Sequence, residues 1–243
     1  MKTLPSVLAA VLSLSTCALA QTATSGNVPA SGVSSPASAP VTDALDRLPR
    51  VLLVGDSIEG GYAPFVQQTL KYAAKIVHMP QSNGASDNGI KEMDAWLAKG
   101  PWAVIHFNWG LWDLKVVGPN GQNNIPIEQY GKNLRELVEK MKRSGATLIF
   151  ATTTPVPERV LITNRRTADA VLYNAVALKI MEENQVHVDD LYALALPRLT
   201  EFQLPSDVHF NDEGYEYLGR NVAKSIEFML YLRKTLEWDK QRP

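Results

Sequence analysis

The sequence predicts an α/β protein of three layers, in which helices cover both faces of a five-stranded parallel sheet. Short apolar runs alternate with longer amphipathic runs from about residue 45 to the C-terminus, which is typical of consecutive βαβ units. The first run, Val51 to Val54, is continuously apolar and half β-branched, as in a strand buried on both faces. A length of 243 residues suits one such domain with appendages.

The individual elements follow from this alternation. Strands are expected at 51–54, 75–78, 102–107, 147–152 and 186–189. Helices are expected at 63–74, 88–99, 127–144, 166–184 and 212–233. The apolar side chains of the third helix recur at the spacing of a buried stripe, at Leu134, Leu137, Val138 and Met141. In such a sheet, ligands bind at the C-terminal edge of the strands.

The N-terminal residues predict export and a linker. Residues 1–20 have a positive start at Lys2, a short apolar run and a small-x-small cleavage site at Ala18 to Ala20, as signal peptides do. A less favoured alternative is a lipobox that would leave Cys17 lipidated. Residues 21–44 are rich in Ser, Ala, Thr and Pro and predict a disordered linker. The folded domain would then span residues 45–243, in a periplasmic or extracellular protein.

Composition narrows the classes of partner. The formal net charge is −1, which indicates no basic surface for nucleic acid. No later stretch reaches the roughly 20 apolar residues of a membrane span. With Cys17 as the single cysteine, cleavage after Ala20 would leave neither disulfides nor thiolate ligands. Oligomeric state leaves no signature in the sequence.

Two stretches far apart supply a serine, a histidine and a carboxylate. The first strand runs into Gly55-Asp56-Ser57, where glycine permits a sharp turn and Ser57 falls at the start of a helix. A serine N-cap is the commoner explanation of such a turn taken alone. Near the C-terminus, Asp207 and His209 stand two residues apart. Together these residue types favour a nucleophilic serine with an oriented histidine base.

Four blocks in order resemble the SGNH/GDSL hydrolase family. Gly55-Asp56-Ser57-Ile58 resembles its serine block, residues 84–86 its glycine block, residues 107–113 its asparagine block and residues 207–209 its histidine block. The resemblance implies the flavodoxin-like SGNH hydrolase fold and ester hydrolysis without a cofactor. It implies Ser57, Asp207 and His209 as the triad, with the N–H groups of Ser57 and Gly84 in the oxyanion hole. The α/β-hydrolase alternative needs Gly-x-Ser-x-Gly, whereas Glu59 stands two residues after Ser57.

The chain departs from the family pattern at two positions. Aligning the third block on Gly110 and Asp113 puts Trp112 where the family has its asparagine oxyanion donor. Asn108 is the alternative donor and is slightly preferred, and the two stay open. The family carboxylate precedes its histidine by three residues, where this chain has Ser206. Asp207, one residue later, is the best candidate to orient His209.

Several other residues have a structural explanation first. His106 and His187 fall inside strands and are expected to be core or near-core imidazoles, while His78 ends a strand and has no partner in the sequence pattern. A metal site from His106, Asp113 and His209 is disfavoured, since no ligand motif stands out. Asp56 is interpreted as bracing the turn.

The loops at this edge offer candidate substrate contacts. Trp109 and Trp112 follow the third strand and could line an acyl or sugar pocket, with core packing as the alternative. Residues 152–158 suit a substrate wall stiffened by prolines. Arg165 and Arg166 could meet an anionic group, although exposed arginines are usually solvated surface.

The predicted function is a secreted serine esterase that removes small acyl groups, acetyl in particular, from small-molecule or glycan esters. A lysophospholipase or lipase-type acylhydrolase would use the same blocks on longer chains. An alternative of another class is a non-catalytic carbohydrate-binding module, with the glycine-rich turn gripping a sugar or an anion.

Overall fold

The computed structural model describes residues 46–79, 84–118, 120–158 and 164–240. All of them belong to one compact unit, Ala39–Pro243. The predicted signal peptide, the linker and Cys17 lie outside the described residues. Within the described ranges, no helix combines the length and apolar character needed to cross a bilayer.

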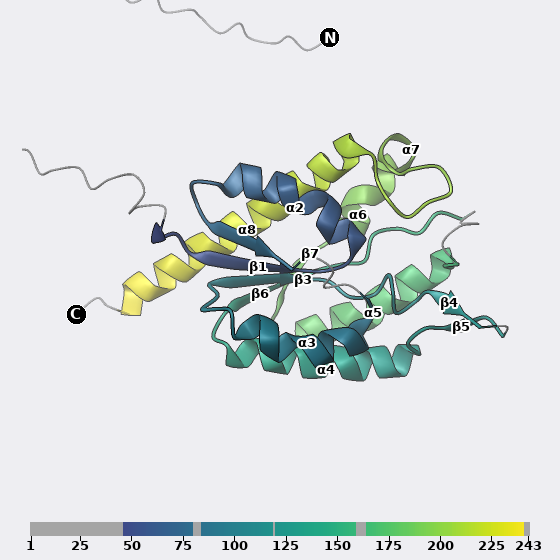
Figure 1. Cartoon of the computed structure of the whole chain (residues 1–243), viewed down its shortest axis with the longest axis horizontal. Coiled ribbons are helices and arrows are strands. Elements are labelled where there is room, and N and C mark those ends of the chain that lie inside the picture. The colour runs from purple at the N-terminus through teal and green to yellow at the C-terminus, as the bar shows by residue number, and fades with distance from the viewer. Residues whose placement is uncertain (1–45, 80–83, 119, 159–163, 241–243) are drawn as a thin grey trace, which may run out of the picture. The chain divides into compact units, whose positions relative to one another are not determined.

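A five-stranded parallel sheet forms the middle layer, as predicted (Figure 1). Its strands are β1 (Arg50–Val54), β2 (Lys75–His78), β3 (Val104–Phe107), β6 (Thr147–Ala151) and β7 (His187–Asp189). Their spatial order is β2-β1-β3-β6-β7. Counted along the parallel strands this is 2-1-3-4-5, the doubly wound order expected for a flavodoxin-like sheet.

The sheet is most apolar at its centre, where β1 and β3 pair. Leu52 faces Ile105 and Val54 faces Phe107 in register, and all four side chains are fully buried. From β1 the chain crosses to β2 on one side, whereas β3 leads to β6 on the other. This reversal makes the carboxyl ends of β1 and β3 the topological switch point, where α/β sheets bind ligands.

Helices cover both faces of the sheet (Figure 1). One face carries α3 (Ser86–Leu97), α4 (Ile127–Arg143) and α5 (Thr167–Glu183), and the other carries α2 (Ser57–Leu70), α6 (Leu191–Ala195) and α8 (Asp212–Lys240). The apolar stripe of α4 is fully buried, as its spacing predicted. All five predicted helices are present.

The largest differences from the predicted helix boundaries are at the start of α2 and the end of α8. Helix α2 begins at Ser57 and not at Ala63, because the Asp56 side chain caps it and its glycines do not prevent helix formation. Helix α8 continues to Lys240, past the expected end at Arg233. The early start of α2 matters for function, because it places Ser57 in the first turn of a helix.

Several short elements were not predicted. After β3 the chain forms a small antiparallel hairpin, β4 (Val116–Val117) and β5 (Gln122–Asn123). After α6 it continues through a 3₁₀ turn, η1 (Leu196–Arg198), into α7 (Leu199–Phe202). These segments have too few residues for a detectable hydrophobic period. They lead into the loops that border the candidate site.

Helices α2 and α8 pack closely on one face through glycines. A Cβ added at Gly61 would lie 2.1 Å from the Tyr215 ring, and one added at Gly219 would lie 2.7 Å from Phe65. Neither position has room for a larger residue without rearrangement. The nucleophile and base candidates lie at the start of this helix pair, since Ser57 is the first residue of α2 and His209 lies in the loop three residues before α8.

Candidate active site

Ser57 is presented at the N-terminus of α2 by a tight turn after β1. Asp56 is the N-cap and accepts a hydrogen bond from Ile58 N at 2.9 Å. Gly55 is required by space, because a Cβ there would lie 2.4 Å from Cβ of Glu59. Ser57 itself is exposed, with the positive end of the helix dipole behind it. The bracing role predicted for Asp56 is thus visible in its cap bond.

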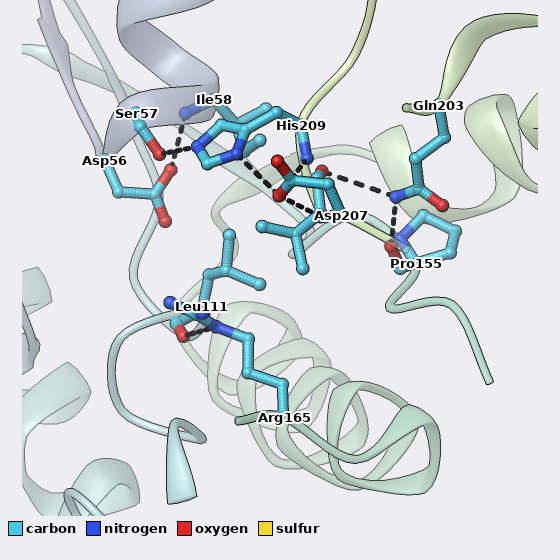
Figure 2. Close-up of polar contacts among 10 residues, drawn as sticks. Asp56, Ser57, Ile58, Leu111, Pro155, Arg165, Gln203, Asp207 and His209 are labelled. Atoms are coloured by element: carbon cyan, nitrogen blue, oxygen red, sulfur yellow. Dashed lines mark hydrogen bonds and ion pairs between the residues drawn. The ribbon is translucent and has the colours of Figure 1, made fainter. Parts of the chain in front are cut away.

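Three of the predicted residues form a continuous chain of contacts (Figure 2). Ser57 Oγ lies 2.8 Å from Nε2 of His209. The other ring nitrogen, Nδ1, lies 2.8 Å from Oδ1 of Asp207. These are hydrogen-bond distances, and their order is that of a nucleophile, a base and the group that orients the base.

Asp207 is held in its ionised form by several donors. Partial burial disfavours the charge, but His209 and the backbone N–H of Val208 outweigh it, and the pKa of Asp207 lies below its usual value. The same oxygen, Oδ1, takes the Val208 N–H at 2.6 Å and the His209 ring. The Asp207 carboxylate is therefore held by a backbone N–H as well as by the imidazole.

The loop that carries Asp207 and His209 is a closed turn. Leu204 N donates to the carbonyl of His209 at 2.9 Å, and Ser206 has a left-handed φ of 57°. Gln203 Nε2 donates to the carbonyls of Pro155, at 2.8 Å, and Val208, at 3.3 Å. This turn explains how a carboxylate two residues before the histidine reaches Nδ1. Gln203 was not identified from the sequence, because its role depends on contacts distant in the chain.

The glycine block is attached to the third block by a buried polar cluster. Asp113 accepts hydrogen bonds from the backbone N–H and the hydroxyl of Ser86, and Asn133 donates to that hydroxyl at 2.8 Å. Burial raises the pKa of Asp113 to about 7. Gly84, two residues before Ser86, has a φ of +120°, which favours glycine. The cluster fixes the start of α3 against the loop after β3.

The geometry argues against Asn108 as an oxyanion donor. Its side chain is only 9% exposed, and Nδ2 donates to the Ala151 carbonyl at 2.7 Å and to Thr153 Oγ1 at 3.3 Å. Both amide hydrogens are engaged in joining β3 to β6, so neither is left for a substrate. These contacts do not support the slight preference for Asn108, and Trp112, the alternative donor, is partly exposed.

The histidines outside this chain of contacts have structural partners. His106 is fully buried, as expected of a core imidazole; its Nε2 lies 3.2 Å from Asp189, while Nδ1 has no hydrogen-bond partner among the described residues. His78, for which the sequence offered no partner, lies 3.7 Å from the buried carboxylate of Glu59, which raises the pKa of His78. Among the described residues, no group of three or more metal-ligating side chains comes together.

Of the two tryptophans expected near the site, Trp109 is core. It is 3% exposed and packs beside Phe107. Trp112 is partly exposed, with the cationic ends of Lys115 and Arg165 near its ring. Of the two adjacent arginines, Arg165 lies at the site and donates from Nε to the Leu111 carbonyl, as Figure 2 shows. Arg166 instead pairs with Asp169 at 2.8 Å.

A serine at a strand-to-helix turn, in contact with a histidine that contacts an aspartate, is the arrangement of a Ser-His-Asp hydrolase. It stands here at the C-terminal edge of a doubly wound parallel sheet. The sequence profile of the GDSL-like Lipase/Acylhydrolase family matches residues 53–217. The chain belongs to this family, whose members are serine hydrolases acting on ester bonds, and the predicted family is thereby confirmed.

Solved structures show the same fold at low sequence identity. An acetyl xylan esterase, AlAXEase, is similar with a TM-score of 0.60 and 18% identity, covering 73% of this chain and 99% of the other. The lipase/acylhydrolase from Enterococcus faecalis is similar with a TM-score of 0.61 and 20% identity, covering 74% of this chain and 96% of the other. A carbohydrate acetylesterase family member from Sinorhizobium meliloti is similar with a TM-score of 0.61 and 17% identity, covering 75% of this chain and 99% of the other. A comparison with curated proteins found no sequence match.

Proposed function

We propose that this GDSL-type esterase is exported and removes small acyl groups, acetyl in particular, from carbohydrate esters through an acyl-enzyme on Ser57. The observation that carries the proposal is the chain of contacts from Ser57 through His209 to Asp207, each 2.8 Å long. A binding module would have no need of an exposed serine in contact with an oriented imidazole. Export rests on the composition of residues 1–20.

The contacts support the following roles in the reaction. His209 removes the proton of Ser57 as its oxygen attacks the acyl carbonyl, and Asp207 stabilises the imidazolium that forms. The tetrahedral oxyanion is met by N–H groups at Ser57 and Gly84, near the N-termini of α2 and α3. His209 then protonates the departing alcohol, and the acyl group remains on Ser57. Water, activated by the same imidazole, releases the acid and restores the serine.

Two features support a small acyl group on a carbohydrate. The described loops at this edge contain no long apolar insertion of the kind that would cover a fatty chain. Trp112 offers a partly exposed ring beside the site, and aromatic rings are suited to stacking on sugars. Two similar structures are titled as an acetyl xylan esterase and a carbohydrate acetylesterase family member, which supports the same choice.

The test is acyl transfer by Ser57→Ala beside the control Ser144→Ala. Ser144 is an exposed serine that ends α4, and its hydroxyl donates to Met141. Ser57→Ala is expected to lose hydrolysis of p-nitrophenyl acetate and labelling by a fluorophosphonate, and Ser144→Ala to retain both. Labelling of Ser57→Ala at another serine would refute the nucleophile. A preference for p-nitrophenyl esters of long acids over the acetate would favour the lysophospholipase alternative.

A further inference from the structure

Two cationic side chains lie beside the exposed tryptophan at the edge of the site. Lys115 Nζ is 4.9 Å from the centre of the Trp112 ring, and Arg165 Cζ is 5.8 Å from it. All three side chains are partly exposed. An aromatic ring with two cations nearby is suited to a ligand that combines a ring with a negative charge.

The backbone holds this group in place. Val116 N donates to the Asn164 carbonyl at 2.6 Å, which joins the segment after Lys115 to the segment before Arg165. The guanidinium of Arg165 is oriented by the bond from its Nε to the Leu111 carbonyl, at 2.6 Å. Trp112 is fixed through its carbonyl, which accepts from Asn124 Nδ2 at 3.2 Å. The Arg165 guanidinium and the Trp112 backbone are therefore held before a ligand binds, which lowers the entropy cost of binding.

Arg165 is also close to the triad. In Figure 2 it reaches toward Leu111 on the side of the site to which the Asp56 carboxylate points. Burial lowers the pKa of Arg165, while the carboxylates of Asp56 and Asp207 oppose that shift. The guanidinium is thus within electrostatic range of the residue that precedes the serine and of the triad aspartate.

The nearby carboxylates are committed to other partners. Asp207 is bound to His209 and to the Val208 N–H, and Asp56 caps α2 through Ile58. Lys115 is partly exposed, and its ammonium lies over the Trp112 ring. At this edge of the site the positive charge is supplied by Lys115 and Arg165, next to the carboxylates of Asp56 and Asp207. Such a site attracts an anionic substrate.

We propose that Trp112, Lys115 and Arg165 form a subsite for a sugar carboxylate, so that the ester is carried by an acidic, uronate-containing glycan. This inference rests on the proposed function and narrows its substrate class. Arg165 would bind the carboxylate in a charge-assisted hydrogen bond, Lys115 would add a point charge, and the indole would contact the sugar ring. The scissile ester would lie on the same or a neighbouring sugar, within reach of Ser57.

The probe is a matched pair, an O-acetylated methyl glucuronoside and the same compound with its carboxylate converted to the methyl ester. Acetate release is followed for both, and the readout is the ratio of their kcat/KM values. The native protein is expected to prefer the anionic compound at least tenfold, equivalent to about 1.4 kcal/mol. Raising the salt concentration from 0.05 to 0.5 M should narrow this ratio, since the charges are partly exposed.

Variants assign the preference to the named residues. Arg165→Gln is expected to reduce the ratio to about twofold or less, and Lys115→Gln to reduce it partially. Arg165→Lys should keep part of it, because the charge remains but the planar fork is lost. Arg135→Gln is the control, because Arg135 lies on α4 and pairs with Glu183 away from the site. This control should keep the full ratio.

The results separate the two proposals. No preference in the native protein, or an unchanged ratio in Arg165→Gln, would overturn the subsite. If Arg165→Gln shows no cooperative thermal transition, Lys115→Gln and Arg165→Lys are compared with the native protein instead. An unchanged kcat/KM ratio in both variants would then overturn the subsite. If the native protein hydrolyses neither of the two glucuronosides nor p-nitrophenyl acetate, the proposed esterase activity on Ser57 is overturned instead.

Discussion

Replacing Asp207 by asparagine separates two functions of its carboxylate. In triad hydrolases this change costs about 10⁴-fold when the amide stabilises the wrong imidazole tautomer. Here one oxygen, Oδ1, accepts both the Val208 N–H at 2.6 Å and the His209 ring at 2.8 Å. An asparagine must keep an oxygen there to satisfy the backbone donor. It would then still accept the ring N–H, and the productive tautomer would survive.

What Asp207→Asn loses is the negative charge beside the imidazolium. Two charges 4 Å apart interact by about 4 kcal/mol at an effective dielectric constant of 20. Both side chains are partly exposed, 28% for Asp207 and 36% for His209, so solvent reduces this. We expect a loss of about 2 to 3 kcal/mol, or about 30- to 160-fold in the rate of acylation. Asp207→Ala, which removes charge and acceptor together, should lose about 10³- to 10⁴-fold.

The assay is the rate of the acylation burst with p-nitrophenyl acetate, measured for the native protein and both variants. Circular dichroism and thermal unfolding check that the loop change leaves the fold intact. Equal losses for the asparagine and alanine variants would refute the argument from the shared oxygen. Near-native acylation by both variants would show that Asp207 does not orient His209.

Two further predictions concern neighbouring groups. Trp112→Phe deletes the indole N–H and keeps an aromatic ring. If the indole binds the oxyanion, this variant is expected to lower kcat about 10²-fold or more with little change in KM, whereas Asn108→Ala should mainly lower stability. Steady-state kinetics and thermal unfolding of both variants show which of them loses kcat. For Asp113, a pKa raised to about 7 means that its stabilising contribution is complete below its unfolded pKa near 4 and is lost as pH rises through 7. The stability of the native protein relative to Asp113→Asn should therefore decline between pH 4 and 7, and parallel pH dependences in urea denaturation would contradict this.

The sheet and its helices were predictable because their signals are local. The apolar run at Val51 to Val54 and the buried stripe of α4 each follow from a hydrophobic period within one element. Ser57 and His209 were recognisable from residue type and block order. In each case the relevant information lies within a few neighbouring residues.

The parts of the site that could not be predicted depend on contacts between distant segments. Asn108 had the right residue type for an oxyanion donor, but its amide is occupied by Ala151 and Thr153, more than forty residues away in the chain. Glu59 as the partner of His78 and Gln203 as the support of the triad loop also depend on tertiary packing. The short helix α7 has too few residues to show a period.

The nucleophile and the loops around it are supported by different parts of the fold, which are joined where Gln203 binds the Pro155 carbonyl. Ser57 and His209 lie at the start of the helix pair α2 and α8, in which Gly61 and Gly219 leave no room for a side chain. The loops with Trp112 and Arg165 lead into α4 and α5 on the other face of the sheet. Substitutions in those loops can alter which esters are accepted while the spacing of nucleophile and base stays the same. Selectivity could thus be redesigned on one face of the sheet without rebuilding the reaction chemistry on the other.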